Sequence, residues 1–214
     1  MIKPSSTPYL TLAEIGYFGQ LLLTLVGAVW FLTTSYSNST PLALATATLY
    51  VCVSSTWLRL GKDAAISRFV GAGALGVAFG VFSWVSAFAN PSLPAVFQIG
   101  LSGVSGFIFL AYIVYQIRAF FTAAEVLEVR LFRFAALILI AGIAATVFSA
   151  VALGAFAVAY GLGSRISNFV PIQIWVGDVW IGALSLVAGM GFHRLKGVVR
   201  LKAAQANHPP SDTG

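Results

Sequence analysis

Charge and cysteine are both scarce in this chain of 214 residues. Only 8% of its residues are charged and 59% are hydrophobic, whereas a soluble domain carries about 25% charged residues. A soluble fold could not bury so much apolar surface, so the composition excludes a soluble globular protein. The single cysteine, Cys52, excludes a disulfide framework or a thiol relay within one chain.

Groups that could hold a cofactor or perform catalysis are also few. The two histidines, His193 and His208, lie at the end of the last apolar run and in the C-terminal tail, so they cannot hold a haem between them within a membrane. No lysine lies within an apolar run, which excludes a retinal Schiff base. No acidic, cysteine or histidine residues have metal-ligand spacing, and no nucleophile has a base in a recognisable arrangement. The sequence therefore predicts no cofactor, no metal and no catalytic residue, and favours a protein that is not an enzyme.

Six long apolar runs fill most of the chain. A membrane-spanning helix needs roughly 20 such residues. The runs cover about 12–36, 42–60, 65–89, 94–117, 131–160 and 170–192. We therefore expect an all-α fold: a polytopic membrane protein built as one bundle of six transmembrane helices over residues 1–205. Residues 206–214 have almost nothing apolar to bury and are predicted to form a disordered tail.

The basic residues alternate between loops, with Arg165 the sole exception. They are Lys3 before the first run; Arg59, Lys62 and Arg68 after the second; Arg118, Arg130 and Arg133 after the fourth; and Arg194, Lys196, Arg200 and Lys202 after the sixth. By the positive-inside rule, both termini are cytoplasmic. The compact chain with short loops is typical of a bacterial inner (cytoplasmic) membrane protein. The net charge of +6 is thus explained by topology and does not indicate nucleic-acid binding. The basic segment after Phe192 would attract anionic lipid headgroups, or would serve only to fix orientation.

Two Thr-x-x-Glu patterns predict helix starts. Thr11 with Glu14, and Thr122 with Glu125, have the spacing of a capping box. The second pattern predicts that the fifth helix begins about two turns before its apolar run. Glu14 would then serve only its own helix terminus. Asp63 is placed to cap the third helix.

The last run contains the one carboxylate that lies deep within any apolar run, Asp178. At 100° per residue, one narrow stripe holds Pro171, Trp175, Asp178, Gly182, Ser185 and Gly189, and the opposite face holds Val176, Trp180, Ala183, Val187 and Met190. We expect the stripe to face other helices. Asp178 lies seven residues past Pro171, about 10 Å inward at 1.5 Å per residue. An unpaired carboxylate there costs at least about 2.5 kcal/mol, so it needs a partner, water or a proton.

Other runs carry matching stripes of small and polar residues, which let helices approach closely. They include Gly16, Gln20, Thr24 and Gly27 in the first run; Thr46, Tyr50, Ser54 and Trp57 in the second; Gly76 and Gly80 in the third; and Gln98, Ser102, Ser105 and Tyr112 in the fourth. The Gly76–Gly80 spacing is that of a GxxxG motif, for which we expect a packing role.

Two interpretations of Asp178 remain open at this point. In the first, Asp178 with Gln98, Ser102 and Thr46 binds a small solute or ion, or carries a proton, in a small permease or channel-like protein. In the second, Asp178 is a satisfied structural carboxylate, bonded to Gln98, a serine or Arg165. The protein is then a non-catalytic membrane subunit or scaffold, which packs as a homo-oligomer or against a membrane partner through its Gly/Ala faces and basic tail.

Overall fold

A computed structural model describes residues 7–33, 40–89, 94–161 and 170–207. Within these ranges all regular structure is helical. The helices are α1 (Thr7–Thr33), α2 (Thr40–Ala64), α3 (Ser67–Ala89), α4 (Ala95–Val126), α5 (Arg130–Ala159) and α6 (Val170–Asn207). All six are long and apolar enough to cross a membrane, which confirms the all-α fold and the number of candidate spans. The predicted tail, 206–214, lies outside the described residues except for the last two residues of α6.

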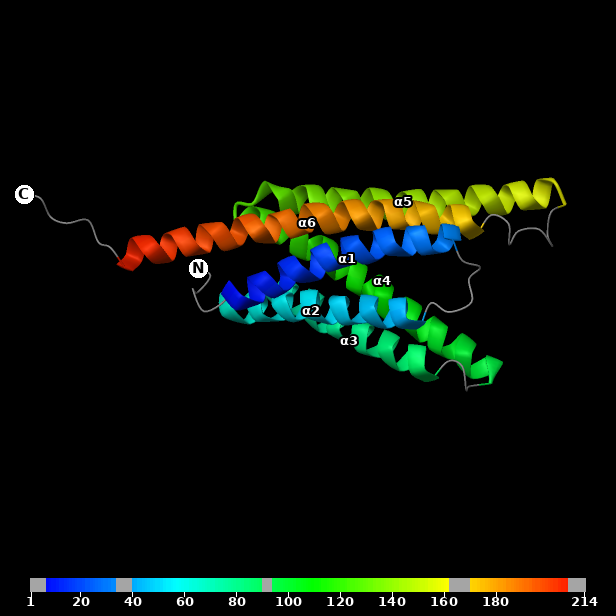
Figure 1. The fold of residues 1–214 in the computed structure, drawn as a ribbon, viewed down its shortest axis with the longest axis horizontal. Coiled ribbons are helices and arrows are strands. Elements are labelled where there is room, and N and C mark those ends of the chain that lie inside the picture. Colours follow the sequence, from blue (N-terminus) through cyan, green and yellow to red (C-terminus); the bar gives the residue numbers. More distant parts are fainter. Residues whose placement is uncertain (1–6, 34–39, 90–93, 162–169, 208–214) are drawn as a thin grey trace, which may run out of the picture.

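The six helices form a closed ring. Each packs against its neighbours in sequence, and α1 packs against α6 to complete the circle. In Figure 1 the beginning of α1, the end of α6 and the α2–α3 and α4–α5 connections all lie at one end of the bundle. We call this the basic end, because it carries the described cations Arg59, Lys62, Arg68, Arg118, Arg130, Arg133, Arg194, Lys196 and Arg200. The opposite end is called the far end.

Glycines allow α2 and α3 to pack closely against each other. A β-carbon at Gly76 would lie 2.0 Å from the Ser54 hydroxyl oxygen, and one at Gly80 would lie 2.6 Å from a methyl group of Val51. At Gly73 it would meet the Leu58 backbone nitrogen at 2.4 Å. Larger residues at these positions would push the helices apart. The predicted packing role of the Gly76–Gly80 pair is confirmed.

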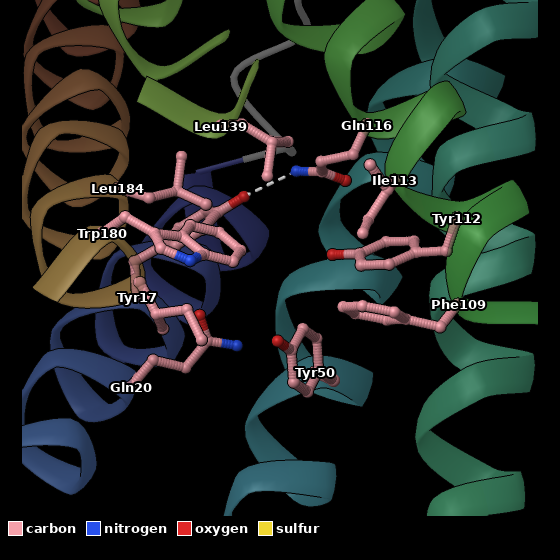
Figure 2. Close-up of a pocket in the computed structure, with 11 residues that line it drawn as sticks. Tyr17, Gln20, Tyr50, Phe109, Tyr112, Ile113, Gln116, Leu139, Trp180 and Leu184 are labelled. Atoms are coloured by element: carbon pink, nitrogen blue, oxygen red, sulfur yellow. Dashed lines mark hydrogen bonds between the residues drawn. The ribbon is translucent and has the colours of Figure 1, made fainter. Parts of the chain in front are cut away.

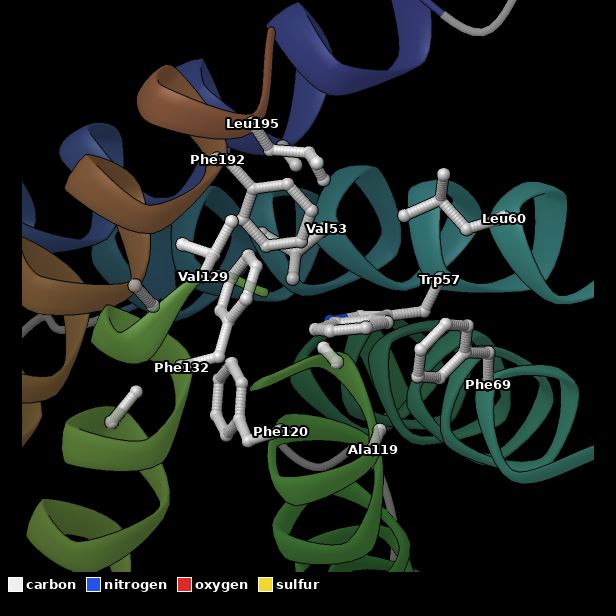
Figure 3. Close-up of a cluster of buried hydrophobic side chains, with 14 of the residues drawn as sticks. Val53, Trp57, Leu60, Phe69, Ala119, Phe120, Val129, Phe132, Phe192 and Leu195 are labelled. Carbon is white, nitrogen blue, oxygen red and sulfur yellow. The ribbon is translucent and has the colours of Figure 1, made fainter. Parts of the chain in front are cut away.

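Aromatic side chains hold the bundle together near the basic end. Trp57, Phe69, Phe120, Phe132 and Phe192 come from α2, α3, α4, α5 and α6, and all are fully buried. We call them the aromatic cluster (Figure 3). The Trp57 ring lies 5.1 Å from Phe69, 5.6 Å from Phe120, 6.0 Å from Phe132 and 5.2 Å from Phe192, centroid to centroid. Five of the six helices therefore meet in one contact group.

The helix ends differ from those that the two capping patterns predicted. Helix α1 begins at Thr7, so Thr11 lies inside it and donates to the Thr7 carbonyl oxygen at 3.2 Å. Helix α4 continues through Thr122 to Val126, and α5 begins at Arg130 after Val129. Both capping boxes are therefore wrong. Thr122 serves a contact between helices instead: its hydroxyl oxygen accepts from Arg68 Nη1 of α3 at 3.1 Å.

Glu14 has its partners on α6. Its carboxylate pairs with His193 Nδ1 at 2.7 Å and also with Lys196 Nζ. This joins the first and last helices at the basic end, in addition to their direct packing. Asp63 lies within α2, four residues before the start of α3, and pairs with Arg59 at 3.4 Å.

The α2–α3 connection uses an alanine in the left-handed region. Ala65 has φ 54°, the Ile66 N–H donates to the Gly61 carbonyl at 2.9 Å, and the Ala65 N–H donates to the Lys62 carbonyl at 3.4 Å. This is the Schellman ending of a helix, in which glycine is usual at the left-handed position.

We expect Ala65→Gly to stabilise the protein by about 0.5–1 kcal/mol. The left-handed conformation costs a non-glycine residue roughly 1–2 kcal/mol, which glycine would not have to pay. The extra flexibility of glycine in the unfolded chain cancels about half of that stabilisation. Equilibrium unfolding in mixed SDS micelles, followed by circular dichroism, measures the change. Ala74→Gly is the matched control, because Ala74 is an exposed residue inside α3 and the same change there should destabilise. An Ala65→Gly protein no more stable than the parent would contradict the strain assigned to this turn.

Candidate functional site: a polar chamber inside the ring

A small cavity lies inside the ring and is lined by residues of five helices (Figure 2). We call it the chamber. Its volume is about 30 Å³. It is lined by Tyr17 and Gln20 of α1, Tyr50 of α2, Phe109, Tyr112, Ile113 and Gln116 of α4, Leu139 of α5, and Trp180, Ile181 and Leu184 of α6. One water needs roughly 10–15 Å³ of such volume, so the chamber has room for about two or three molecules of that size.

Tyr17 accepts two hydrogen bonds on the side of the chamber that adjoins the aromatic cluster. Its hydroxyl oxygen accepts from Gln116 Nε2 at 2.8 Å and from Trp57 Nε1 at 3.4 Å. Its ring is stacked on Phe192 at 5.6 Å between centroids. The chamber is thus fixed directly to the aromatic cluster, which closes the bundle on the basic-end side.

Two glutamine amides of the chamber each leave one atom without a hydrogen bond. Gln20 accepts from the Ser185 hydroxyl through Oε1 at 3.5 Å, but its Nε2 has no partner among the described residues. Gln116 donates through Nε2, but its Oε1 has no partner there. The two residues are only 7% and 3% exposed. A buried amide group left unpaired costs about 1–3 kcal/mol, so these atoms mark a place where a guest molecule would be bound.

Two tyrosine hydroxyls add to the polar lining. Tyr50 and Tyr112 stand edge to face, with ring centroids 5.9 Å apart. Figure 2 shows both hydroxyls directed toward the side of the chamber formed by α1. Behind them, Phe79 of α3 packs on both rings, at 5.3 Å from Tyr50 and 6.2 Å from Tyr112. The hydroxyls are therefore held in place by a rigid aromatic backing.

Trp180 forms the wall between α5 and α6. Its Nε1 donates to the Thr146 hydroxyl oxygen at 3.0 Å. Its ring lies flat against Gly142, where a β-carbon would come within 2.4 Å of the indole. Helical periodicity predicted that Trp180 and Val187 lie on a face that points away from the other helices. This prediction is wrong for both residues. Trp180 and Val187 pack against the core, while Ala183 and Met190 of the same face are exposed.

The predicted inward stripe of α6 does face another helix. Gly182, Ser185 and Gly189 are buried, and the position of a β-carbon on Gly189 lies 3.2 Å from the Phe18 ring of α1. Asp178 is half-buried on this stripe and has no hydrogen-bond partner among the described residues. It lies one turn from Ile181, which lines the chamber. Because α6 runs from the far end to the basic end, Asp178 is on the far-end side of the chamber wall.

The other predicted site residues are Thr46, Gln98 and Ser102. Thr46 lies in α2 and does not line the chamber, while Gln98 and Ser102 lie in the first turns of α4. The side chains of Gln98 and Ser102, and all of Arg165, lie outside the described residues. In Figure 1 the first turns of α4 and α6 are at the same end of the bundle but stand apart. Their assembly with Asp178 into one site stays a prediction.

The stripes read from the sequence contained part of the chamber, namely Gln20, Tyr50 and Tyr112. Tyr17 and Gln116 were missed. A signal for Gln116 was available, because it continues the α4 stripe one turn beyond Tyr112, at a spacing of four residues. Tyr17 lies three residues before Gln20 and so shares its helix face, but its hydrogen-bonding role comes from partners on α2 and α4.

Comparison with protein-family models, with curated protein sequences and with solved structures finds no match for this chain. The chemistry of the chamber is therefore the basis for assigning a function.

Proposed function

We propose that the protein is a small permease or channel-like protein, with the chamber as the point through which a small solute passes. The observation that supports this most strongly is the pair of buried, unpartnered amide atoms, Gln20 Nε2 and Gln116 Oε1, at the centre of a ring of apolar helices. Buried polar groups are nearly always satisfied. A bundle used only for packing would gain stability from apolar residues at these two positions.

In this proposal Asp178 is the binding or proton-coupling group on the far-end side of the chamber. Of the described carboxylates it is the one that does not lie near the basic end, and it adjoins the chamber wall through Ile181. Gln98, Ser102 and Thr46, on helices that lead to the same end, would assist it. An ionisable residue within a membrane span is a functional candidate by default, because its burial is costly.

The proposed location is an inner (cytoplasmic) membrane, with the basic end and both termini in the cytoplasm. The gathering of the described cations at one end of the bundle supports this orientation. The basic end of α6 would then contact anionic lipid headgroups.

Asp178→Asn tests this assignment. The amide keeps the size of the carboxylate and removes its charge and its proton exchange, so we expect solute flux into proteoliposomes to fall about tenfold, the factor that 1.4 kcal/mol represents. Thermal stability in detergent should be unchanged. Ser55→Ala is a suitable control, since the Ser55 hydroxyl bonds only the Val51 carbonyl of its own helix, at 2.7 Å. Full flux in the variant would remove Asp178 from the pathway, and a loss of stability would favour a structural carboxylate.

A membrane scaffold is the second candidate, favoured by one observation. Gly100, Gly103 and Gly106 on the far-end half of α4 are exposed, and no atom of the described structure lies within 4 Å of a β-carbon built on any of them. Glycines in a span usually permit close helix contact, and these have no such contact within the chain. A second copy of the chain or a membrane partner would supply it. The mass of the detergent-solubilised particle, measured by light scattering, separates the two.

A further inference from the structure

The chamber lining specifies the chemistry of its guest, an inference that rests on the proposed function. Gln20 offers N–H donors through Nε2, and Gln116 offers an acceptor through Oε1. A guest that satisfies both must accept one hydrogen bond and donate another. The hydroxyls of Tyr50 and Tyr112 can do either, so they add affinity without restricting the guest further.

Charge is excluded by what surrounds these polar groups. None of the eleven lining residues is charged. The remaining wall is apolar, formed by Phe109, Ile113, Leu139, Ile181 and Leu184. A bare ion taken from water into such a site loses its hydration shell, and the described lining offers it no opposite charge in return. The carboxylate of Asp178 lies outside the lining and does not supply a counter-charge within it.

Size sets the third limit. Pockets for drug-sized ligands have about 300–1,000 Å³, whereas the chamber has about 30 Å³. The volume is therefore too small for a quaternary ammonium group, the cation that aromatic side chains commonly enclose.

We infer that the chamber binds and passes an uncharged molecule of at most about three heavy atoms that both donates and accepts hydrogen bonds. Water and ammonia belong to this class. Potassium, ammonium and larger solutes do not.

The purified full-length chain in liposomes tests the inference with separate arms for each species. Stopped-flow light scattering after an osmotic step measures water permeation. Alkalinisation of a trapped pH dye after addition of ammonium chloride measures ammonia entry, and a membrane-potential dye measures potassium and ammonium currents. We expect water or ammonia to cross faster than in protein-free liposomes, with no increase in either ion current.

Gln20→Met and Gln116→Met keep side-chain length and remove the unpartnered amide atoms. Each should lower the neutral flux about tenfold. Leu184→Phe is an independent variant that fills the chamber without substituting either glutamine, and it should give the same loss. Thr11→Val is the control on α1, because Thr11 bonds only its own helix backbone, at 3.2 Å. It should keep the parental flux.

The outcomes separate the inference from the proposed function. If potassium or ammonium ions cross and the neutral species do not, the permease function stands and the neutral guest is wrong. If water or ammonia crosses but all three chamber variants keep the parental flux, the path lies elsewhere and the inference is overturned. If no species crosses faster than in protein-free liposomes, then both the proposed function and the inference fail.

Discussion

Trp57→Ala is expected to destabilise the protein by roughly 2–3 kcal/mol. In soluble proteins the loss of a buried tryptophan costs about 3–5 kcal/mol, but lipid is as apolar as the protein interior, so the part due to removal from water drops out. The remaining cost comes from the dispersion contacts that the ring loses and from the cavity that it leaves behind. Both are large here, since Trp57 touches aromatic rings on α3, α4, α5 and α6 and donates to Tyr17 of α1.

The measurement is equilibrium unfolding in mixed SDS micelles, monitored by circular dichroism. Trp84→Ala is the matched control, because Trp84 is 47% exposed on α3 whereas Trp57 is 0% exposed on α2. The control should change stability by less than about 1 kcal/mol, in the range of surface substitutions. Equal effects of the two variants would mean that the aromatic cluster does not hold the helices together.

The six spans could be predicted from the sequence because the signal is a bulk property. About 20 apolar residues suffice for each span, and no knowledge of partners is needed. Positions of helix ends are a different kind of information. Thr122 and Glu14 match capping patterns in the sequence, but the structure uses them between helices, with Arg68 on α3 and with His193 and Lys196 on α6. A local pattern cannot reveal that a distant residue offers a better partner.

Helical periodicity identified inward faces but not which faces meet. The stripe of Gly182, Ser185 and Gly189 was correctly turned toward another helix, and Gln20 and Tyr50 were correctly grouped on inward stripes. Periodicity of 3.6 residues defines a direction on one helix only. The ring order, and above all the closure of α1 against α6, decides that Gln20 meets Ser185 and faces the chamber.

The sequence also favoured a charged residue, Asp178, over the glutamine amides as the centre of a site. Asp178 stands out because a carboxylate in a span is costly, whereas a glutamine is cheaper and less conspicuous. In the structure the described cavity is lined by two glutamines and three tyrosines, and Asp178 is next to its wall. Tyr17 could not have been singled out, because its importance depends on Trp57 and Gln116, 40 and 99 residues away in the chain.

Tyr17→Phe is expected to cost about 2 kcal/mol of stability. The change removes one oxygen atom and keeps the ring stacked on Phe192. It leaves two buried donors, Gln116 Nε2 and Trp57 Nε1, without their acceptor. Each unpaired donor costs about 1–3 kcal/mol, and the 3.4 Å bond from Trp57 contributes at the low end of that range. Tyr9→Phe on the same helix is the control, and it should be close to neutral since Tyr9 is exposed.

A double-mutant cycle that combines Tyr17→Phe with Gln116→Met isolates the hydrogen bond from Gln116 Nε2 to the Tyr17 hydroxyl. Replacing both partners of a buried hydrogen bond by apolar groups is far less costly than replacing one. The protein with both changes should therefore be more stable than the sum of the single effects predicts, by about 1 kcal/mol of coupling. Purely additive effects would show that Tyr17 and Gln116 do not hold each other. The coupling would then have to be sought between Tyr17 and Trp57, and Gln116 would be free to turn both ends of its amide toward a guest.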